Sequence, residues 1–107
     1  MIFISMSTDY KMKNTVNLLS KHISIFELFT KVYLFGSVIK SNKEPNDIDL
    51  LLIYQKYSED IFGAKNAIES FLNKLFDLGI DITILSEKEL EQTGFMEKIA
   101  SSCKWLK

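Results

Sequence analysis

The stretch that decides the fold runs LFGSVIKSNKEPNDIDLLLI, residues 34–53. A short apolar run over residues 31–35 ends at the pair Gly36-Ser37, and after a polar loop Asp47 and Asp49 open a second apolar run that ends at Tyr54. Both runs have the composition of buried strands. Because the second run is apolar at nearly every position after Asp49, it predicts a central strand that is covered on both faces.

Helical periodicity flanks these two strands. Apolar residues recur at steps of three and four over residues 11–29, which predicts a core-facing helix. A second helix is expected after Ser58, a suitable N-cap, with Gly79 placed to end it. The apolar stripes are Met12, Val16, Leu19, Ile23 and Phe26 in the first helix, and Ile61, Ala64, Ile68, Phe71, Leu72, Leu75 and Leu78 in the second.

The last third of the chain begins with a third apolar run. Residues 80–85 predict a strand, and Ser86 with Glu89 has the spacing of a capping box for a short helix. A further helical turn is expected over residues 95–100. The segment around Trp105 shows no pattern that assigns it.

The order of these elements predicts where polar residues meet. The second and third strands are joined by a helix of about five turns, which is the arrangement of a crossover between parallel neighbours. The first strand reaches the second through a loop, so the two most simply run antiparallel. We therefore expect an α/β fold with a small mixed β-sheet and helices packed mainly on one face. The residues gathered at one edge of this sheet would be Gly36, Ser37, Asp47, Asp49 and Asp81.

The carboxylates at this edge indicate a metal site. Asp47 and Asp49 are two positions apart on a strand, so their side chains point to the same face. Carboxylate oxygens are hard ligands that suit Mg²⁺. With two ions a few ångströms apart, one ion can activate an attacking hydroxyl while the other neutralises a triphosphate and its leaving pyrophosphate.

The joint pattern resembles the signature of the DNA polymerase β-like nucleotidyltransferases, most closely their minimal, MNT-type bacterial members. That resemblance implies the minimal nucleotidyltransferase fold over nearly the whole chain. It places Asp47 and Asp49 as ligands of two Mg²⁺ ions and Asp81 as the residue that completes the ion nearest the acceptor. It further implies that Gly36 and Ser37 hold the triphosphate tail. Lys40 stands where similar proteins often carry a basic residue that contacts phosphates.

The resemblance also implies an activity. Members transfer a nucleoside monophosphate, here most simply AMP from ATP, to a hydroxyl on a protein or RNA. Small stand-alone members often act as antitoxins beside a HEPN-type ribonuclease toxin. The alternative, from another functional class, is a non-catalytic binding module that masks a partner protein. Antibiotic modification, a third option, needs an acceptor pocket that this length hardly supplies.

Composition limits the remaining choices. At 107 residues, 47% of them hydrophobic, residues 1–107 are expected to form a single nucleotidyltransferase domain. This leaves no room for the helical domain that larger members carry, so we expect a second copy or another protein to complete the site. The net charge of −1 gives no broad basic field for nucleic acid, and all 13 basic residues are lysine, which contacts phosphate as a point charge.

The expected location is a reducing cytoplasm. Cys103, the single cysteine of the sequence, cannot form an internal disulfide, and no apolar stretch approaches the roughly 20 residues that cross a bilayer. Lys104 stands beside Cys103, but nothing else in the sequence supports a reactive thiol, and we interpret Cys103 as an inert packed residue. His22 has no nearby carboxylate or cysteine that would suggest a metal site, and we interpret it as a surface or core residue.

Overall fold

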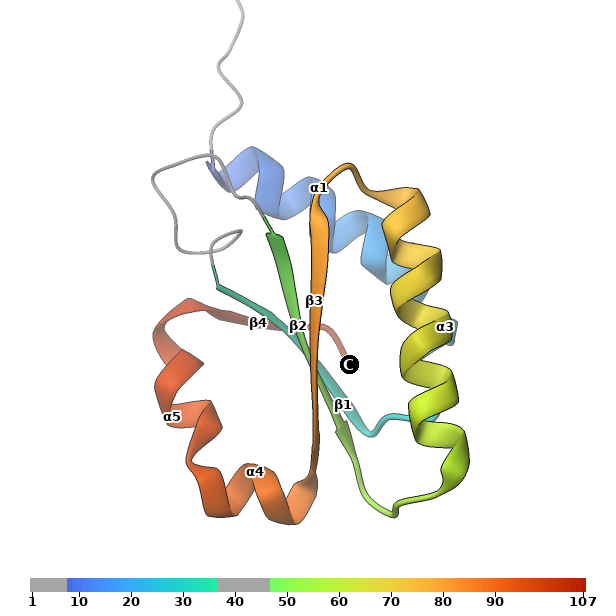
Figure 1. Cartoon of the computed structure of the whole chain (residues 1–107). Helices are drawn as coiled ribbons and strands as arrows, with labels where there is room; N and C mark the ends of the chain where they lie inside the picture. The colour runs from blue at the N-terminus through green and yellow to red at the C-terminus, as the bar shows by residue number, and fades with distance from the viewer. Residues whose placement is uncertain (1–7, 37–46) are drawn as a thin grey trace, which may run out of the picture.

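The computed structural model describes residues 8–36 and 47–107, with side chains from Lys13 onward (Figure 1). Within these ranges, none of the helices combines the length and the apolar character that a membrane span needs. The elements are α1 (Thr8–Lys21), η1 (Ile23–Phe26), β1 (Lys31–Phe35), β2 (Asp47–Tyr54), α3 (Glu59–Leu75), β3 (Gly79–Ser86), α4 (Glu87–Thr93), α5 (Phe95–Ile99), η2 (Ala100–Ser102) and β4 (Cys103–Trp105).

The strands form one mixed sheet in the order β3-β2-β1-β4. β1 pairs with β2 antiparallel, and β2 pairs with β3 parallel, so both predicted pairings are confirmed. β2 lies inside the sheet and its residues Leu50–Ile53 are fully buried. This matches the continuous apolar run in the sequence, because an inner strand covered on both faces has no solvent side.

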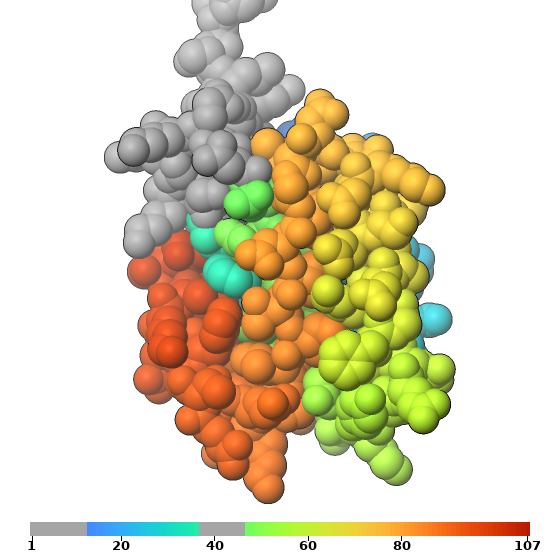
Figure 2. Space-filling model, in the orientation of Figure 1, coloured from blue at the N-terminus to red at the C-terminus, as the bar shows by residue number. Residues whose placement is uncertain are grey.

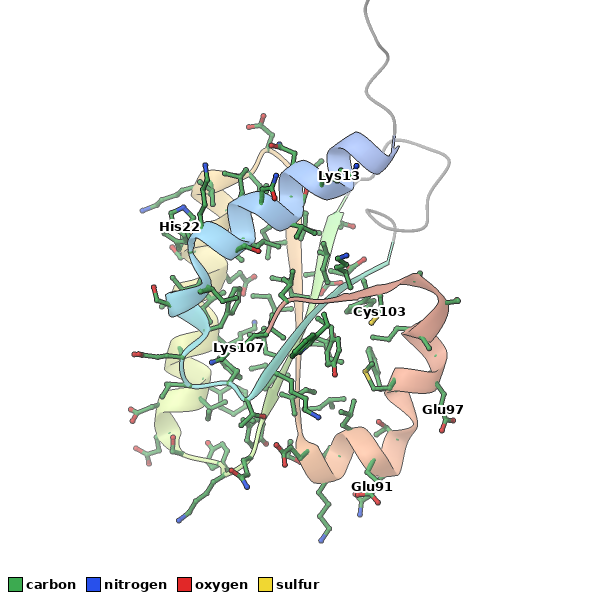
Figure 3. The ribbon with its side chains drawn as sticks, turned by 180° about the vertical axis from the view of Figure 1, so that it is seen from behind. Lys13, His22, Glu91, Glu97, Cys103 and Lys107 are labelled. Carbon is green, nitrogen blue, oxygen red and sulfur yellow. The ribbon has the colours of Figure 1, made fainter. Side chains whose placement is uncertain are left out.

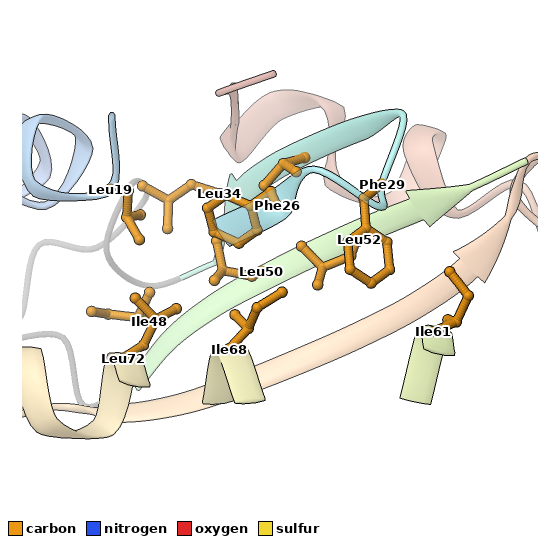
Figure 4. Packing of buried hydrophobic residues seen from close by; sticks show 11 residues of the cluster. Leu19, Phe26, Phe29, Leu34, Ile48, Leu50, Leu52, Ile61, Ile68 and Leu72 are labelled. Atoms are coloured by element: carbon orange, nitrogen blue, oxygen red, sulfur yellow. The ribbon is translucent and has the colours of Figure 1, made fainter. Parts of the chain in front are cut away.

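The main core lies between the sheet and the two longer helices. Alternate residues of β2 point toward α1, η1 and α3, where they meet apolar side chains from all three (Figure 4). Full burial of each such side chain contributes about 1.5–3 kcal/mol to stability. The fully buried members include Leu19, Phe26, Phe29, Val32, Leu34, Ile48, Leu50, Leu52 and Leu72.

A smaller core covers part of the opposite face. Leu51 and Ile53 pack there against Ile99 of α5, with Leu90 of α4 and Phe95 at the margin. The longer helices thus lie on one face and the short ones cover part of the other (Figure 1). The expected α/β fold with its small mixed sheet is confirmed.

The first helix ends earlier than its periodicity predicts. A regular helix runs only to Lys21, and a 3₁₀ turn continues the chain to Phe26 through bonds such as Ile25 N–H to the His22 carbonyl, 3.0 Å. The stripe still faces inward, since Leu19 and Phe26 are fully buried. Tertiary burial of Phe26 and Phe29 favours the tighter turn over the local preference to continue the helix.

β4 is an element that the sequence pattern does not reveal. Cys103–Trp105 pairs antiparallel with β1, and the chain continues beside it, with Leu106 N–H donating to the Val32 carbonyl at 2.8 Å. The Lys107 ammonium donates to the carbonyls of Phe26 and Phe29, at 3.0 and 2.7 Å (Figure 3). Leu106 and Lys107 therefore link η1 to the sheet through hydrogen bonds.

The two predicted helix caps differ in strength. Ser86 accepts from Glu89 N–H at 3.0 Å while the Glu89 carboxylate accepts from Ser86 N–H at 2.9 Å, a complete capping box on α4. Ser58 holds the N-cap position of α3, but its side chain makes no capping hydrogen bond.

This contrast gives a test by matched serine substitutions. Ser86→Ala should lower the free energy of unfolding by about 1 kcal/mol, because it removes a hydrogen bond to an otherwise unpaired helix amide. Ser58→Ala should change it by only a few tenths of a kcal/mol, since no such bond is lost. Urea unfolding of both variants measures the difference, and equal effects would show that the Ser86 cap does not stabilise α4.

Candidate functional site

Three aspartates lie at the edge of the sheet where β2 and β3 begin. Asp47 and Asp49 belong to the first residues of β2, and Asp81 lies directly opposite Asp49 on β3. Gly36, which follows the last residue of β1, reaches the same edge because Phe35 pairs with Asp49. We call these four residues, Gly36, Asp47, Asp49 and Asp81, the carboxylate edge. The predicted meeting of their strands at one edge is confirmed.

The three aspartates also share one face of the sheet. Side chains alternate along a strand, so Asp47 and Asp49 point to the face that carries Leu51 and Ile53, toward α4 and α5. Asp81 points the same way, because residues paired in register on neighbouring strands share a face. The face opposite holds the main core.

Gly36 fits this site through its backbone conformation and its lack of a side chain. Its φ of +81° lies in the left-handed region. A β-carbon placed on Gly36 would overlap the carboxylate of Asp49. The turn is also fixed from the C-terminal segment, since Gly36 N–H donates to the Ser102 carbonyl at 3.3 Å. Only glycine satisfies both the conformation and the contact without rearrangement.

The carboxylates of the edge are accessible to different degrees. Asp47 and Asp81 are exposed, whereas Asp49 is partly buried. The start of β2 reaches the molecular surface beside the end of β1 and the start of β3 (Figure 2). Neighbouring strands lie about 4.8 Å apart, so the paired carboxylates of Asp49 and Asp81 repel one another unless a cation lies near them.

The donor set suits a hard divalent cation, because carboxylate oxygens are the ligands that Mg²⁺ prefers. Among the described residues, however, no group of three His, Cys, Asp or Glu side chains is close enough together to hold a metal ion as it stands. The structure places the three aspartates at one edge of the sheet, with their side chains on the same face. Their assignment as ligands stays a prediction.

Two of the predicted phosphate-binding residues cannot be placed. Ser37 and Lys40 lie outside the described residues. Their roles stay predictions. Of the residues expected to hold the nucleotide, Gly36 alone is described, and it lies against Asp49.

Phe35 borders the site on its sheet face. It lies between Asp49 on β2 and Cys103 on β4, and its ring meets that of Phe95 edge to face, with 5.6 Å between centroids. Burial raises the pKa of the Cys103 thiol, which keeps the thiol protonated and poorly nucleophilic. No local pattern in the sequence predicts that Phe95 and Ser102 lie near the site, because both are brought there by the return of the chain along β1.

His22 lies away from the carboxylate edge. It follows α1 and its ring meets Phe71 of α3 edge to face, with 5.1 Å between centroids (Figure 3). Its side chain therefore packs against an aromatic ring of α3, on the side of the sheet opposite the aspartates.

Comparison with known proteins gives a consistent result. A family model described as polymerase beta, nucleotidyltransferase, matches residues 13–106. The structure of the toxin-antitoxin MntA-HpeT, in mutant form, has 18% sequence identity and a TM-score of 0.53, over 90% of this chain and 72% of that chain. A protein from Sulfolobus solfataricus assigned to the nucleotidyltransferases has 18% identity and a TM-score of 0.49, over 89% and 78%. No curated protein matches by sequence.

Proposed function

Because the chain belongs to the polymerase beta nucleotidyltransferase family, we propose that it transfers a nucleoside monophosphate, AMP from ATP, to a hydroxyl group on a protein or RNA, with release of pyrophosphate. The observation that carries the proposal is the register of β2 and β3. This register sets Asp81 opposite Asp49, and Asp47 lies on the same face of the sheet. Gly36, which follows β1, reaches the same edge.

Asp47, Asp49 and Asp81 would hold Mg²⁺ in this proposal. When bound, the ions supply Lewis-acid stabilisation of the phosphate charge and lower the pKa of the acceptor hydroxyl. The chain itself supplies position. Asp49 is held against Gly36 and is partly buried, so its carboxylate has little freedom. Asp47, two residues earlier on β2, and Asp81, opposite Asp49 on β3, are exposed.

The triphosphate would lie over the turn after β1. Gly36 has no side chain of its own at this turn, and the Asp49 carboxylate lies where its β-carbon would be, so a phosphate over the turn would lie close to that carboxylate. Ser37 would offer its amide and hydroxyl to phosphate oxygens, and Lys40 would supply a positive charge. Because lysine makes a single point contact rather than a paired one, we expect the phosphates to be held less rigidly than arginine would hold them.

We further propose that the protein acts in the cytoplasm as the antitoxin of a HEPN-type toxin, which it modifies or masks. The similarity to the MntA-HpeT structure supports this, since that complex is a toxin-antitoxin pair and the fold is shared over 90% of this chain. The protein partner would complete the acceptor side of the site.

A label-transfer experiment tests the proposal. The purified protein is incubated with each α-labelled nucleoside triphosphate in turn, with Mg²⁺ or Mn²⁺ and a cell lysate. We expect label from ATP on a discrete protein or RNA band, and loss of that label with EDTA or with Asp47→Asn. Asparagine keeps the size of aspartate but not its negative charge, so the fold should survive.

The same experiment separates transfer from binding alone. If no nucleotide gives label while the folded protein still captures a partner from the lysate, the chain is a binding module. If the label on the acceptor is as strong with Asp47→Asn as with the wild-type protein, the carboxylate edge does not take part in the transfer.

A further inference from the structure

A groove opens between α3 and η1, on the face of the molecule away from the carboxylate edge. Its volume is about 330 Å³, and all of its lining residues have apolar side chains. The lining residues are Ile25, Ala64, Ala67, Ile68 and Phe71. His22 lies beside this part of α3, where it contacts Phe71 (Figure 3).

One stripe of α3 at the margin of this groove is solvent-exposed and has an unusual composition. Successive helical residues are about 100° apart, so Asp60, Gly63, Ala67, Phe71 and Lys74 fall within about 40° of one line along the helix. All five are exposed, and Phe71 exposes 37% of its surface. The stripe therefore carries a charge of each sign at its ends, a large ring, and two small residues.

Gly63 is the least expected member of the stripe. It lies inside a helix of 17 residues, where glycine is less favourable than alanine. A β-carbon placed there would meet nothing within 4 Å, so contacts within the chain do not require glycine. A close approach from outside the chain would explain the missing side chain.

We propose that a second copy of this chain packs on the stripe, with the two α3 helices antiparallel and Ala67 on the two-fold axis. In a two-fold pair of antiparallel helices, residues equally far from the axis on opposite sides meet. Phe71 lies four residues after Ala67 and Gly63 lies four before it. The ring of Phe71 in each copy therefore covers Gly63 of the other, and the small Ala67 allows the helices to approach.

Charge complementarity favours a second copy as the occupant. Asp60 is seven residues before Ala67 and Lys74 is seven after it, so the same pairing brings each Asp60 to Lys74 of the other copy. The acidic first turn of α3 in each copy thus lies against the basic last turn of α3 in the other copy. The pairing of Phe71 with Gly63 and the pairing of Asp60 with Lys74 therefore occur at the same register, with Ala67 on the two-fold axis.

This dimer leaves the proposed reaction site open. The aspartates point to the face that carries α4 and α5, whereas the stripe belongs to a helix on the opposite face. The inference does not depend on the proposed function, and its experiment does not measure activity.

Sedimentation equilibrium of the full chain over a wide range of concentration tests the proposal. The wild-type protein should show a monomer–dimer equilibrium. Ala67→Glu puts two like charges at the two-fold axis and should raise the dimer dissociation constant about a hundredfold. Asn66→Glu adds the same charge to the neighbouring exposed position, about 100° away from the stripe, and should leave the constant nearly unchanged.

A charge exchange tests the register. Asp60→Lys should weaken the dimer about threefold to tenfold, because it sets two lysines against each other at both ends of the interface. Adding Lys74→Asp should restore the wild-type dissociation constant. Circular dichroism of each variant checks that α3 remains folded.

The remaining outcomes overturn the proposal. A wild-type protein that stays monomeric at every concentration, or that binds only a different protein, shows that a second copy is not the occupant. A dimer that Ala67→Glu does not weaken uses another surface. A dimer weakened by Asp60→Lys that Lys74→Asp does not restore lacks the antiparallel register.

Discussion

Replacement of Asp49 by asparagine is expected to lower nucleotidyl transfer about a thousandfold or more, because it removes one of the carboxylates that would hold the Mg²⁺ ions, and those ions would stabilise the negative charge of the transition state. Asp49 lies in the middle of the carboxylate edge, opposite Asp81, and its carboxylate contacts Gly36. Asparagine has nearly the same shape, so the strand and its pairing should not change. The expected result is loss of transfer by a protein that remains folded.

The measurement is the initial rate of label transfer at saturating ATP and Mg²⁺, with circular dichroism on the same sample. Glu91→Gln is the matched control, because it removes one carboxylate from the exposed surface of α4, far from the edge. We expect its rate to equal that of the wild-type protein. A rate for Asp49→Asn within a few-fold of wild type would contradict the assignment of the site.

Gly36→Ala is expected to damage both stability and transfer. At φ +81° an alanine is strained by about 1–2 kcal/mol. The added carbon would also overlap the Asp49 carboxylate, so either the turn or Asp49 must move. We expect the free energy of unfolding to fall by about 1–3 kcal/mol. Transfer should fall by a factor of about a hundred or more, since a displacement of one ångström can have this effect.

Gly94→Ala separates strain from displacement of the carboxylate. Gly94 has φ +63°, also left-handed, but a β-carbon there would meet only the end of the Glu97 side chain at 3.4 Å. The backbone strain in Gly94→Ala should therefore lower the free energy of unfolding by a similar amount, about 1–2 kcal/mol, while transfer activity is kept. Equal loss of transfer in the two variants, compared well below their unfolding transitions, would show that Gly36 does not act through Asp49.

The strands and their pairings were predictable because local signals and topology agreed. The apolar run after Asp49 indicated an inner strand, and the helix between β2 and β3 required a parallel crossover. Those two inferences are enough to predict that Asp47, Asp49 and Asp81 lie at one edge of the sheet, as the structure shows. The capping box of Ser86 and Glu89 was equally local and is present.

The features that the sequence did not reveal depend on contacts distant in the chain. β4 has three residues without a period, and it forms because β1 offers a free edge to pair with. The end of α1 at Lys21 reflects burial of Phe26 rather than a breaker residue. The closeness of Gly36 to both Asp49 and Ser102 likewise follows from pairing, not from composition.

The most direct measurement of the central claim compares α-labelled with γ-labelled ATP, in parallel reactions with the wild-type protein, Mg²⁺ and the acceptor fraction. Nucleotidyl transfer leaves the α-phosphorus on the acceptor and releases the other two phosphates as pyrophosphate. We predict label on the acceptor from α-labelled ATP alone, with γ-label recovered in pyrophosphate. Acceptor labelled from γ-labelled ATP, or from neither nucleotide, would contradict the account.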